Sequence, residues 1–154
     1  MATYVVDANV IVQACVDAAG LGSLASHDLK APPVMRSEAL SSLHEMRYRG
    51  EVSTELAGLA LKRLSAMAVE ILGPKSLARM AWDVAESLGW AKTYDAEYVA
   101  LAQILECPVV TLDARMARGA RRLTRIIGPG DVATEVPVRH DHLATRERRV
   151  EDRP

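Results

Sequence analysis

The sequence predicts an α/β domain built on a mainly parallel sheet. Short apolar runs rich in β-branched residues alternate with longer segments whose apolar residues recur every three or four positions. Hydrophobic residues make up 49% of the 154-residue chain and charged residues 25%, as in ordinary globular proteins. A chain of this length can bury enough apolar surface to fold as one domain without a metal or a disulfide.

Extended segments are recognised by short apolar runs and by proline. Buried strands are predicted over residues 3–6 and 108–112 from their composition. A last edge strand is predicted over residues 123–127. Pro32 and Pro33 predict a short extended piece over 31–35, since a proline disfavours the helical conformation in the residue before it. Residues 67–72 alternate between apolar and other positions and are also expected to form a strand.

Helices are expected between these segments. Ser37 is expected to cap a helix over 38–49 with Leu40 on its apolar stripe, and Gly50 is expected to end it. Ser53 starts the next helix, and Gly89 ends a later one. The expected helices cover residues 9–19, 38–49, 53–64, 76–88, 93–105 and 114–122.

Composition also predicts the cellular location of the protein and the bounds of its folded domain. Cys15 and Cys107 have no Cys-x-x-Cys spacing, which argues against a zinc finger or a disulfide scaffold. No apolar run reaches the roughly 20 residues of a membrane span, so a cytoplasmic domain without membrane contact is expected. Residues 1–132 form the predicted domain, and 133–154 a charged tail, disordered or an exposed helix.

Acidic residues occur at the expected functional edge of the sheet. Asp7 and Asp113 each follow a predicted strand, and Glu38 and Asp95 each stand near the start of a predicted helix. Singly, each acid is explained as a helix cap or as a favourable charge in the first helical turn. In an open parallel sheet, however, ligands bind beyond the carboxyl ends of the strands, so the four acids can face one cleft.

A shared cleft would constrain the chemistry of these acids. Two carboxylates ~4 Å apart repel by roughly 4 kcal/mol at an effective dielectric of 20, so four remain ionised together only around a cation. A site with oxygen ligands and no nearby His or Cys favours Mg²⁺, with Mn²⁺ as a substitute, over zinc. Such a site suits hydrolysis of phosphodiesters, because the metal activates water and stabilises charge on phosphate oxygens.

The sequence blocks around these acids resemble PIN-domain ribonucleases, most closely the VapC-type toxins of bacterial toxin–antitoxin pairs. The blocks are Val5-Val6-Asp7-Ala8-Asn9, Ser37-Glu38-Ala39-Leu40, Tyr94-Asp95-Ala96-Glu97-Tyr98-Val99-Ala100-Leu101-Ala102 and Val110-Thr111-Leu112-Asp113-Ala114-Arg115. They occur in the family's order between about residues 4 and 131. The resemblance implies a PIN-like three-layer fold in which Asp7, Glu38, Asp95 and Asp113 form the catalytic, metal-binding quartet, supported by the polar residues Asn9 and Thr111.

The resemblance further implies an Mg²⁺-dependent endoribonuclease that acts as a toxin, forms a homodimer and is neutralised by a cognate VapB-type antitoxin. Two alternatives stay open: a PIN-domain nuclease for RNA processing without an antitoxin, and a non-catalytic domain that binds RNA or a protein partner. A phosphotransfer protein is less compatible, because the phosphatase pattern requires a second Asp where Asn9 stands. The sequence does not identify the RNA that is cut.

Two further features concern partners. Arg115, Arg118 and Arg122 would share one face of a helix over 114–122 and could follow an RNA backbone from the fourth acid. The same arginines could contact an acidic segment of the antitoxin, or Arg122 could complement the helix C-terminus. The helices over 38–64 carry more apolar residues than one buried stripe needs, which fits either ordinary packing or an interface.

Overall fold

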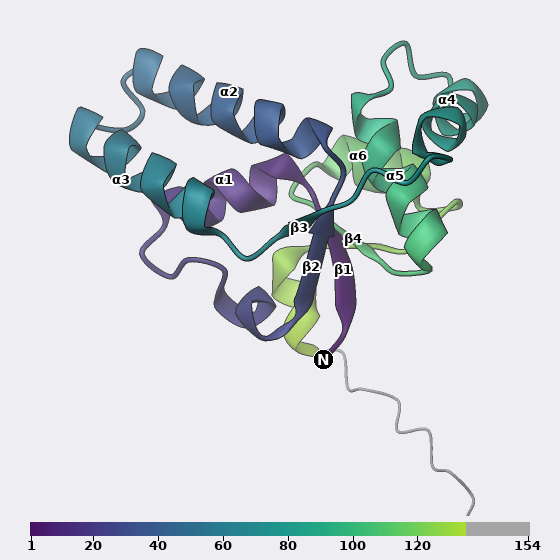
Figure 1. Cartoon of the computed structure of the whole chain (residues 1–154), viewed down its shortest axis with the longest axis horizontal. Coiled ribbons are helices and arrows are strands. Elements are labelled where there is room, and N and C mark those ends of the chain that lie inside the picture. Colours follow the sequence, from purple (N-terminus) through teal and green to yellow (C-terminus); the bar gives the residue numbers. More distant parts are fainter. Residues whose placement is uncertain (135–154) are drawn as a thin grey trace, which may run out of the picture.

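A computed structural model describes residues 1–134 of the chain, which form a parallel α/β sandwich (Figure 1). The strands of this part are β1 (Thr3–Val6), β2 (Asp28–Ala31), β3 (Glu70–Ile71), β4 (Val109–Val110) and β5 (Ile126–Ile127). Its α-helices are α1 (Ala8–Val16), α2 (Val34–Tyr48), α3 (Thr54–Ala66), α4 (Leu77–Leu88), α5 (Tyr94–Leu105) and α6 (Ala114–Ala120). The α/β class predicted from the alternating pattern is confirmed.

Within the described residues the sheet has the order β3-β2-β1-β4-β5, and every neighbouring pair is parallel. Figure 1 shows α1, α2 and α3 gathered on one side of the sheet and α4, α5 and α6 on the other, which confirms the three-layer arrangement. Because β1 lies at the centre between β2 and β4, the residues that follow β1 and β4 are brought to one edge. No helix in this part is both long and apolar enough to cross a bilayer.

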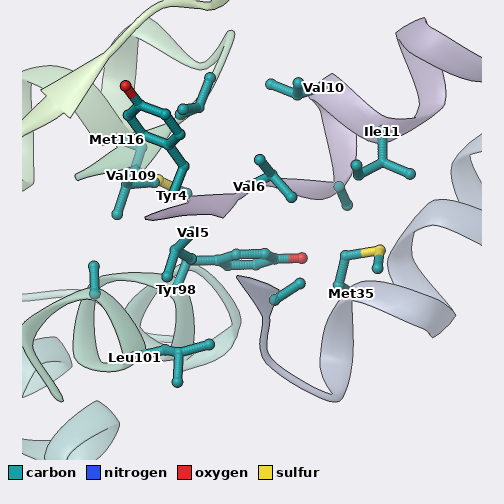
Figure 2. Packing of buried hydrophobic residues seen from close by; sticks show 14 of the residues in the cluster. Tyr4, Val5, Val6, Val10, Ile11, Met35, Tyr98, Leu101, Val109 and Met116 are labelled. Atoms are coloured by element: carbon teal, nitrogen blue, oxygen red, sulfur yellow. The ribbon is translucent and has the colours of Figure 1, made fainter. Parts of the chain in front are cut away.

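The core consists of aliphatic and sulfur-containing side chains and two tyrosines. Tyr4 of β1 and Tyr98 of α5 are the largest fully buried side chains, and both have 0% exposure. Figure 2 shows Tyr98 beside Leu101 on one side of β1, with its hydroxyl pointing toward α2, and Val10 of α1 on the other side. A buried tyrosine needs a partner for its hydroxyl, so the position of Tyr98 has a consequence at the site described below.

The predicted helix boundaries are confirmed where a cap is local. Ser53 accepts a hydrogen bond from the backbone N–H of Leu56 (3.0 Å) and starts α3. Gly50 and Gly89 adopt left-handed φ values of 72° and 67° after α2 and α4, where a β-carbon would be strained. Thr93 precedes α5 as predicted, although its side chain makes no capping hydrogen bond.

Other predicted boundaries are wrong. The extended piece over 31–35 ends at Ala31, and α2 begins at Val34, so Ser37 lies inside the helix and does not cap it. Pro33 occupies the N-cap position with helical dihedrals, which a proline tolerates because the first turn requires no donated N–H. Leu40, predicted on the buried stripe of this helix, is 51% exposed.

The remaining differences are the length of three strands, the end of the first helix and the C-terminal end. The helix expected over 9–19 is α1, which ends at Val16. The expected strands over 67–72, 108–112 and 123–127 are present as two-residue strands. The helix expected over 114–122 ends at Ala120. A short 3₁₀ helix (Pro129–Thr134) closes the described part and buries Val132 against the core. The predicted tail over 133–154 lies, apart from its first two residues, outside the described residues.

Candidate active site

Asp7 is a buried carboxylate at the carboxyl end of the central strand. Its backbone N–H donates to the carbonyl of Val110 (3.0 Å), which continues the β1–β4 ladder, and its own carbonyl accepts the first hydrogen bonds of α1. The side chain is only 6% exposed and accepts a hydrogen bond from the Thr111 hydroxyl (2.7 Å). Burial raises the pKa of Asp7 to about 6, although the Thr111 hydrogen bond favours the charged form.

Thr111 connects the two strand ends. Its hydroxyl oxygen accepts from the backbone N–H of Asp113 (3.0 Å) and from the Asn9 amide (3.4 Å) while its hydroxyl donates to Asp7. The Asn9 carbonyl oxygen accepts in turn from the backbone N–H of Leu112 (3.2 Å). Asn9 and Thr111 therefore hold the loop after β4 against the start of α1.

Glu38 extends from the second turn of α2 and is held by a residue 60 positions away. The hydroxyl of Tyr98 donates to Glu38 Oε1 (2.7 Å), and burial raises the pKa of Glu38 against the effect of this bond. Burial, followed by the hydrogen bond to Glu38, also raises the pKa of Tyr98. A tyrosine hydroxyl is protonated at neutral pH, and the raised pKa keeps Tyr98 a hydrogen-bond donor to Glu38 there.

Asp95 and Asp113 stand on either side of one arginine. Asp113 is the N-cap of α6, where its Oδ1 accepts from the backbone N–H groups of Arg115 (2.7 Å) and Met116 (3.3 Å). Its Oδ2 and that of Asp95 each lie 3.7 Å from Nη2 of Arg115. Burial raises the pKa of Asp95, and repulsion from Asp113 acts in the same direction, while Arg115 opposes both.

The structure brings the four predicted acids together. The charge of Asp95 affects the pKa of Asp7 and of Glu38. The charge of Glu38 also affects the pKa of Asp7, and the charge of Asp113 affects the pKa of Asp95. In each case the neighbouring charge raises the pKa, which is the effect of like charges held close together. The carboxyl edge of the sheet thus carries one coupled acidic cluster, formed by residues that span more than 100 positions of the chain.

Glu97 is a fifth acid near this cluster and was not predicted. Burial raises its pKa, and the charge of Glu38 adds to the rise. The contact of Tyr98 with Glu38 is not predicted by the sequence patterns either, because the two residues lie 60 positions apart. A tyrosine among aliphatic residues on a buried face is the signal that could have revealed it, since the buried hydroxyl requires an acceptor.

The donor set fits a hard divalent cation by its chemistry. All side chains of the quartet offer carboxylate oxygens, the ligands that Mg²⁺ and Mn²⁺ prefer. Within residues 1–134, no three His, Cys, Asp or Glu side chains are already arranged as a cage around one ion. Mg²⁺ does not require such a cage, because it is commonly held by one or two carboxylates, several waters and the phosphates of the substrate.

The three arginines predicted to bind substrate have different positions. Arg115 lies at the acidic cluster, and Arg118 is exposed on α6. Arg122 lies beyond the end of α6, and its Nη2 donates to the carbonyl of Ser87 in the last turn of α4 (3.3 Å). The expected single helical face of three arginines is therefore not formed, because the helix ends before Arg122.

A pocket of about 480 Å³ opens beside the acidic cluster. Acidic, aromatic and basic side chains all line it. Its lining consists of Glu38, Gly89, Trp90, Ala91, Lys92, Tyr94, Asp95, Arg115 and Met116.

Residues 4–122 match the family model described as PIN domain. The VapC ribonuclease Mb0985 of Mycobacterium bovis is 31% identical over 114 residues, covering 73% of this chain and 87% of that protein. Ribonuclease VapC3 of Mycobacterium tuberculosis is 33% identical over 95 residues, covering 62% and 67%. PAE2754 from Pyrobaculum aerophilum shares the fold, with a TM-score of 0.67 at 22% identity over 87% of this chain and 97% of that one. VapBC2 from Rickettsia felis, solved with a promoter DNA fragment, has a TM-score of 0.60 at 12% identity over 82% and 98%.

Proposed function

We propose that this chain, which belongs to the PIN domain family, is a metal-dependent endoribonuclease. It would act as the toxin of a toxin–antitoxin pair. The observation that carries this proposal is the coupled cluster of Asp7, Glu38, Asp95 and Asp113 at the carboxyl edge of the sheet. The names of the relatives, VapC ribonucleases, support RNA as the substrate. An RNA substrate and a protein inhibitor would support a cytoplasmic location, which is part of this proposal.

Asp7, Asp95 and Asp113 would hold Mg²⁺ or Mn²⁺ directly or through water, and Glu38 would complete the site or orient the attacking water. When bound, such an ion lowers the pKa of water and stabilises charge on phosphate oxygens. In hydrolysis the water oxygen forms a bond to phosphorus, the bond from phosphorus to the leaving ribose oxygen breaks, and that oxygen receives a proton.

The protein's own residues prepare the site for this reaction. Thr111 fixes one oxygen of Asp7, and Tyr98 fixes one oxygen of Glu38, so both carboxylates have defined orientations before RNA arrives. Arg115 contacts Asp95 and Asp113 only at 3.7 Å and is largely exposed. Its guanidinium can therefore turn from these carboxylates to a phosphate, which its planar donors match well.

A VapB-type antitoxin is the proposed protein partner, and the structure offers an apolar groove for it. The groove measures about 440 Å³ and lies between α1, α2, α3 and β3. Leu40 of α2 and Leu61 of α3 line it and are 51% and 45% exposed, whereas the neighbouring Ala60 of α3 is fully buried. We also propose a homodimer that uses part of this helical surface, including Leu59 (45% exposed). Light scattering that shows a monomer at micromolar concentration would contradict the dimer.

Cleavage of RNA by the purified protein tests the proposed activity. In Mg²⁺ the wild-type protein should cut RNA, and EDTA should stop the reaction without unfolding the domain. Asp95→Asn should lower the rate by at least about 100-fold, as removal of one key electrostatic group typically does. Asp83→Asn, which alters an exposed acid paired with Arg79 on α4, is the matched control and should cut normally. Cleavage by Asp95→Asn at the wild-type rate would refute the site.

A further inference from the structure

We infer that the pocket beside Asp95 binds a nucleobase of single-stranded RNA, stacked on the ring of Tyr94. The inference rests on the proposed function and specifies how the substrate is positioned. Tyr94 is the first residue of α5 and directly precedes Asp95, so their Cα atoms lie only ~3.8 Å apart. A base held on Tyr94 would therefore lie close to the phosphate bound at the acidic cluster.

The exposure of Tyr94 has no structural explanation. Its side chain is 52% exposed, and within the described residues its hydroxyl makes no hydrogen bond. Tyr4 and Tyr98 are completely buried in the core, and Tyr48 is exposed but does not line the pocket. A half-exposed ring that lines the pocket offers a surface on which a planar ligand can stack.

Trp90 forms a fixed wall of the same pocket. Gly89 ends α4 with a left-handed φ of 67°, and the backbone N–H of Trp90 then donates to the carbonyl of Ala85 (2.9 Å). The indole packs on α6, where a β-carbon at Gly119 would stand 3.0 Å from its Cζ2 atom. Glycine at position 119 permits this close approach, so the pocket has one aromatic wall that packs on α6 and one half-exposed aromatic ring.

The charges around the pocket match a nucleotide. Lys92 and Arg115 line it together with the two aromatic residues, while Glu38 and Asp95 line its acidic part. Each nucleotide of a single strand carries a planar base and a negative phosphate. Proteins bind single strands by combining aromatic stacking with cationic contacts to the backbone, and stacking tolerates any base. The geometry thus favours an unpaired RNA segment over a duplex, whose bases are stacked on each other.

Binding measurements with a defined probe test the inference. The probe is a fluorescein-labelled 12-nucleotide oligoadenylate, and a 12-mer of abasic ribose phosphate is its counterpart; Ca²⁺ replaces Mg²⁺ to prevent cutting. Tyr94→Ala should weaken oligoadenylate binding roughly 5- to 150-fold, the range expected for loss of one stacked base. Tyr94→Phe should restore wild-type affinity, because it keeps the ring. Tyr48→Ala removes another exposed tyrosine (84%), at the end of α2, and should bind normally.

The abasic probe separates stacking from other effects. Wild-type protein and Tyr94→Ala should bind it equally, since it offers no base to the ring. The chain has two tryptophans, so Trp82→Phe leaves Trp90 as the sole indole, and its fluorescence should be quenched by oligoadenylate but not by the abasic probe. Unchanged oligoadenylate binding in Tyr94→Ala, or an equal loss with both probes, would overturn the inference. A wild-type protein that neither binds nor cuts RNA would instead refute the proposed function, and the inference with it.

Discussion

Replacing Asp7 by Asn should stabilise the metal-free protein at neutral pH. The fold buries this carboxyl and raises its pKa from 3.8 to about 6, so the folded state disfavours the charged form. The gap between the two values corresponds to ~3 kcal/mol of unfolding free energy. Asn can still accept the hydrogen bond from Thr111, but its NH₂ group requires a new partner, which offsets about 1 kcal/mol. The expected net gain is ~1–2 kcal/mol at pH 7.5.

The sign of the effect depends on pH in a defined way. Below about pH 4, Asp7 is protonated in the folded and the unfolded states, and its burial carries no charge penalty. As the pH rises from about 4 to 6, the unfolded state releases the proton first, so stability is progressively lost. Above about pH 6 the penalty is complete. The advantage of Asp7→Asn should therefore be present at pH 7.5 and largely absent at pH 4.

Urea denaturation in EDTA at the two pH values measures this difference. Asp83→Asn, an exposed acid on α4, should change the unfolding free energy by less than about 0.5 kcal/mol at either pH. Adding Mg²⁺ should stabilise the wild-type protein by about 2.7 kcal/mol at a concentration 100 times the Kd, and Asp7→Asn by less. An Asp7→Asn protein that is no more stable than wild type at pH 7.5, or whose advantage persists unchanged at pH 4, would refute the reasoning.

Three other substitutions test separate contacts. Ser53→Ala should lower the unfolding free energy by about 1 kcal/mol in urea, because α3 loses its N-cap; an unchanged midpoint would contradict the cap. Tyr98→Phe should cost about 1.5–3 kcal/mol at pH 7, because Glu38 loses its donor, and a stability equal to wild type would show that the bond contributes nothing. Arg118→Ala should reduce the slope of log RNA affinity against log salt concentration by about 0.7. This is the value for one phosphate contact on a single strand. Arg122→Ala should leave that slope unchanged, because the Arg122 guanidinium donates to the carbonyl of Ser87. Equal slopes in the two variants would contradict different roles for the two arginines.

The order of the elements was predictable because local patterns determine it. Apolar periodicity and cap residues such as Ser53 and Gly89 act within a few positions, so they identify helices and their ends directly. The extended segment predicted over 31–35 was wrong beyond Pro33. The rule that a proline disfavours helix in the residue before it applies to Ala31 and Pro32 alone. Pro33 is itself followed by Val34, whose conformation no proline restricts, and the helix starts there.

The location of the acidic cluster was predictable for a topological reason. Parallel strands bring their carboxyl ends to one edge, so Asp7 and Asp113 had to approach each other once the sheet was parallel. The positions of Glu38 and Asp95 within that cluster required the resemblance to a family, because helix starts can lie at many places around a sheet. Asp95 and Asp113 each lie 3.7 Å from Arg115, and Glu38 lines the same pocket as Asp95, so Glu38 and Asp95 both lie near the end of β4.

By itself, the sequence determined the succession of strands and helices, the parallel topology and the edge at which the acids gather, since spacing along the chain encodes all three. Only the tertiary structure decided which groups touch: Tyr98 with Glu38, Thr111 with Asp7, and Arg122 with Ser87. These partners are 60, 104 and 35 positions apart. Local periodicity carries no information about such distances, because each contact depends on how two elements pack across the core.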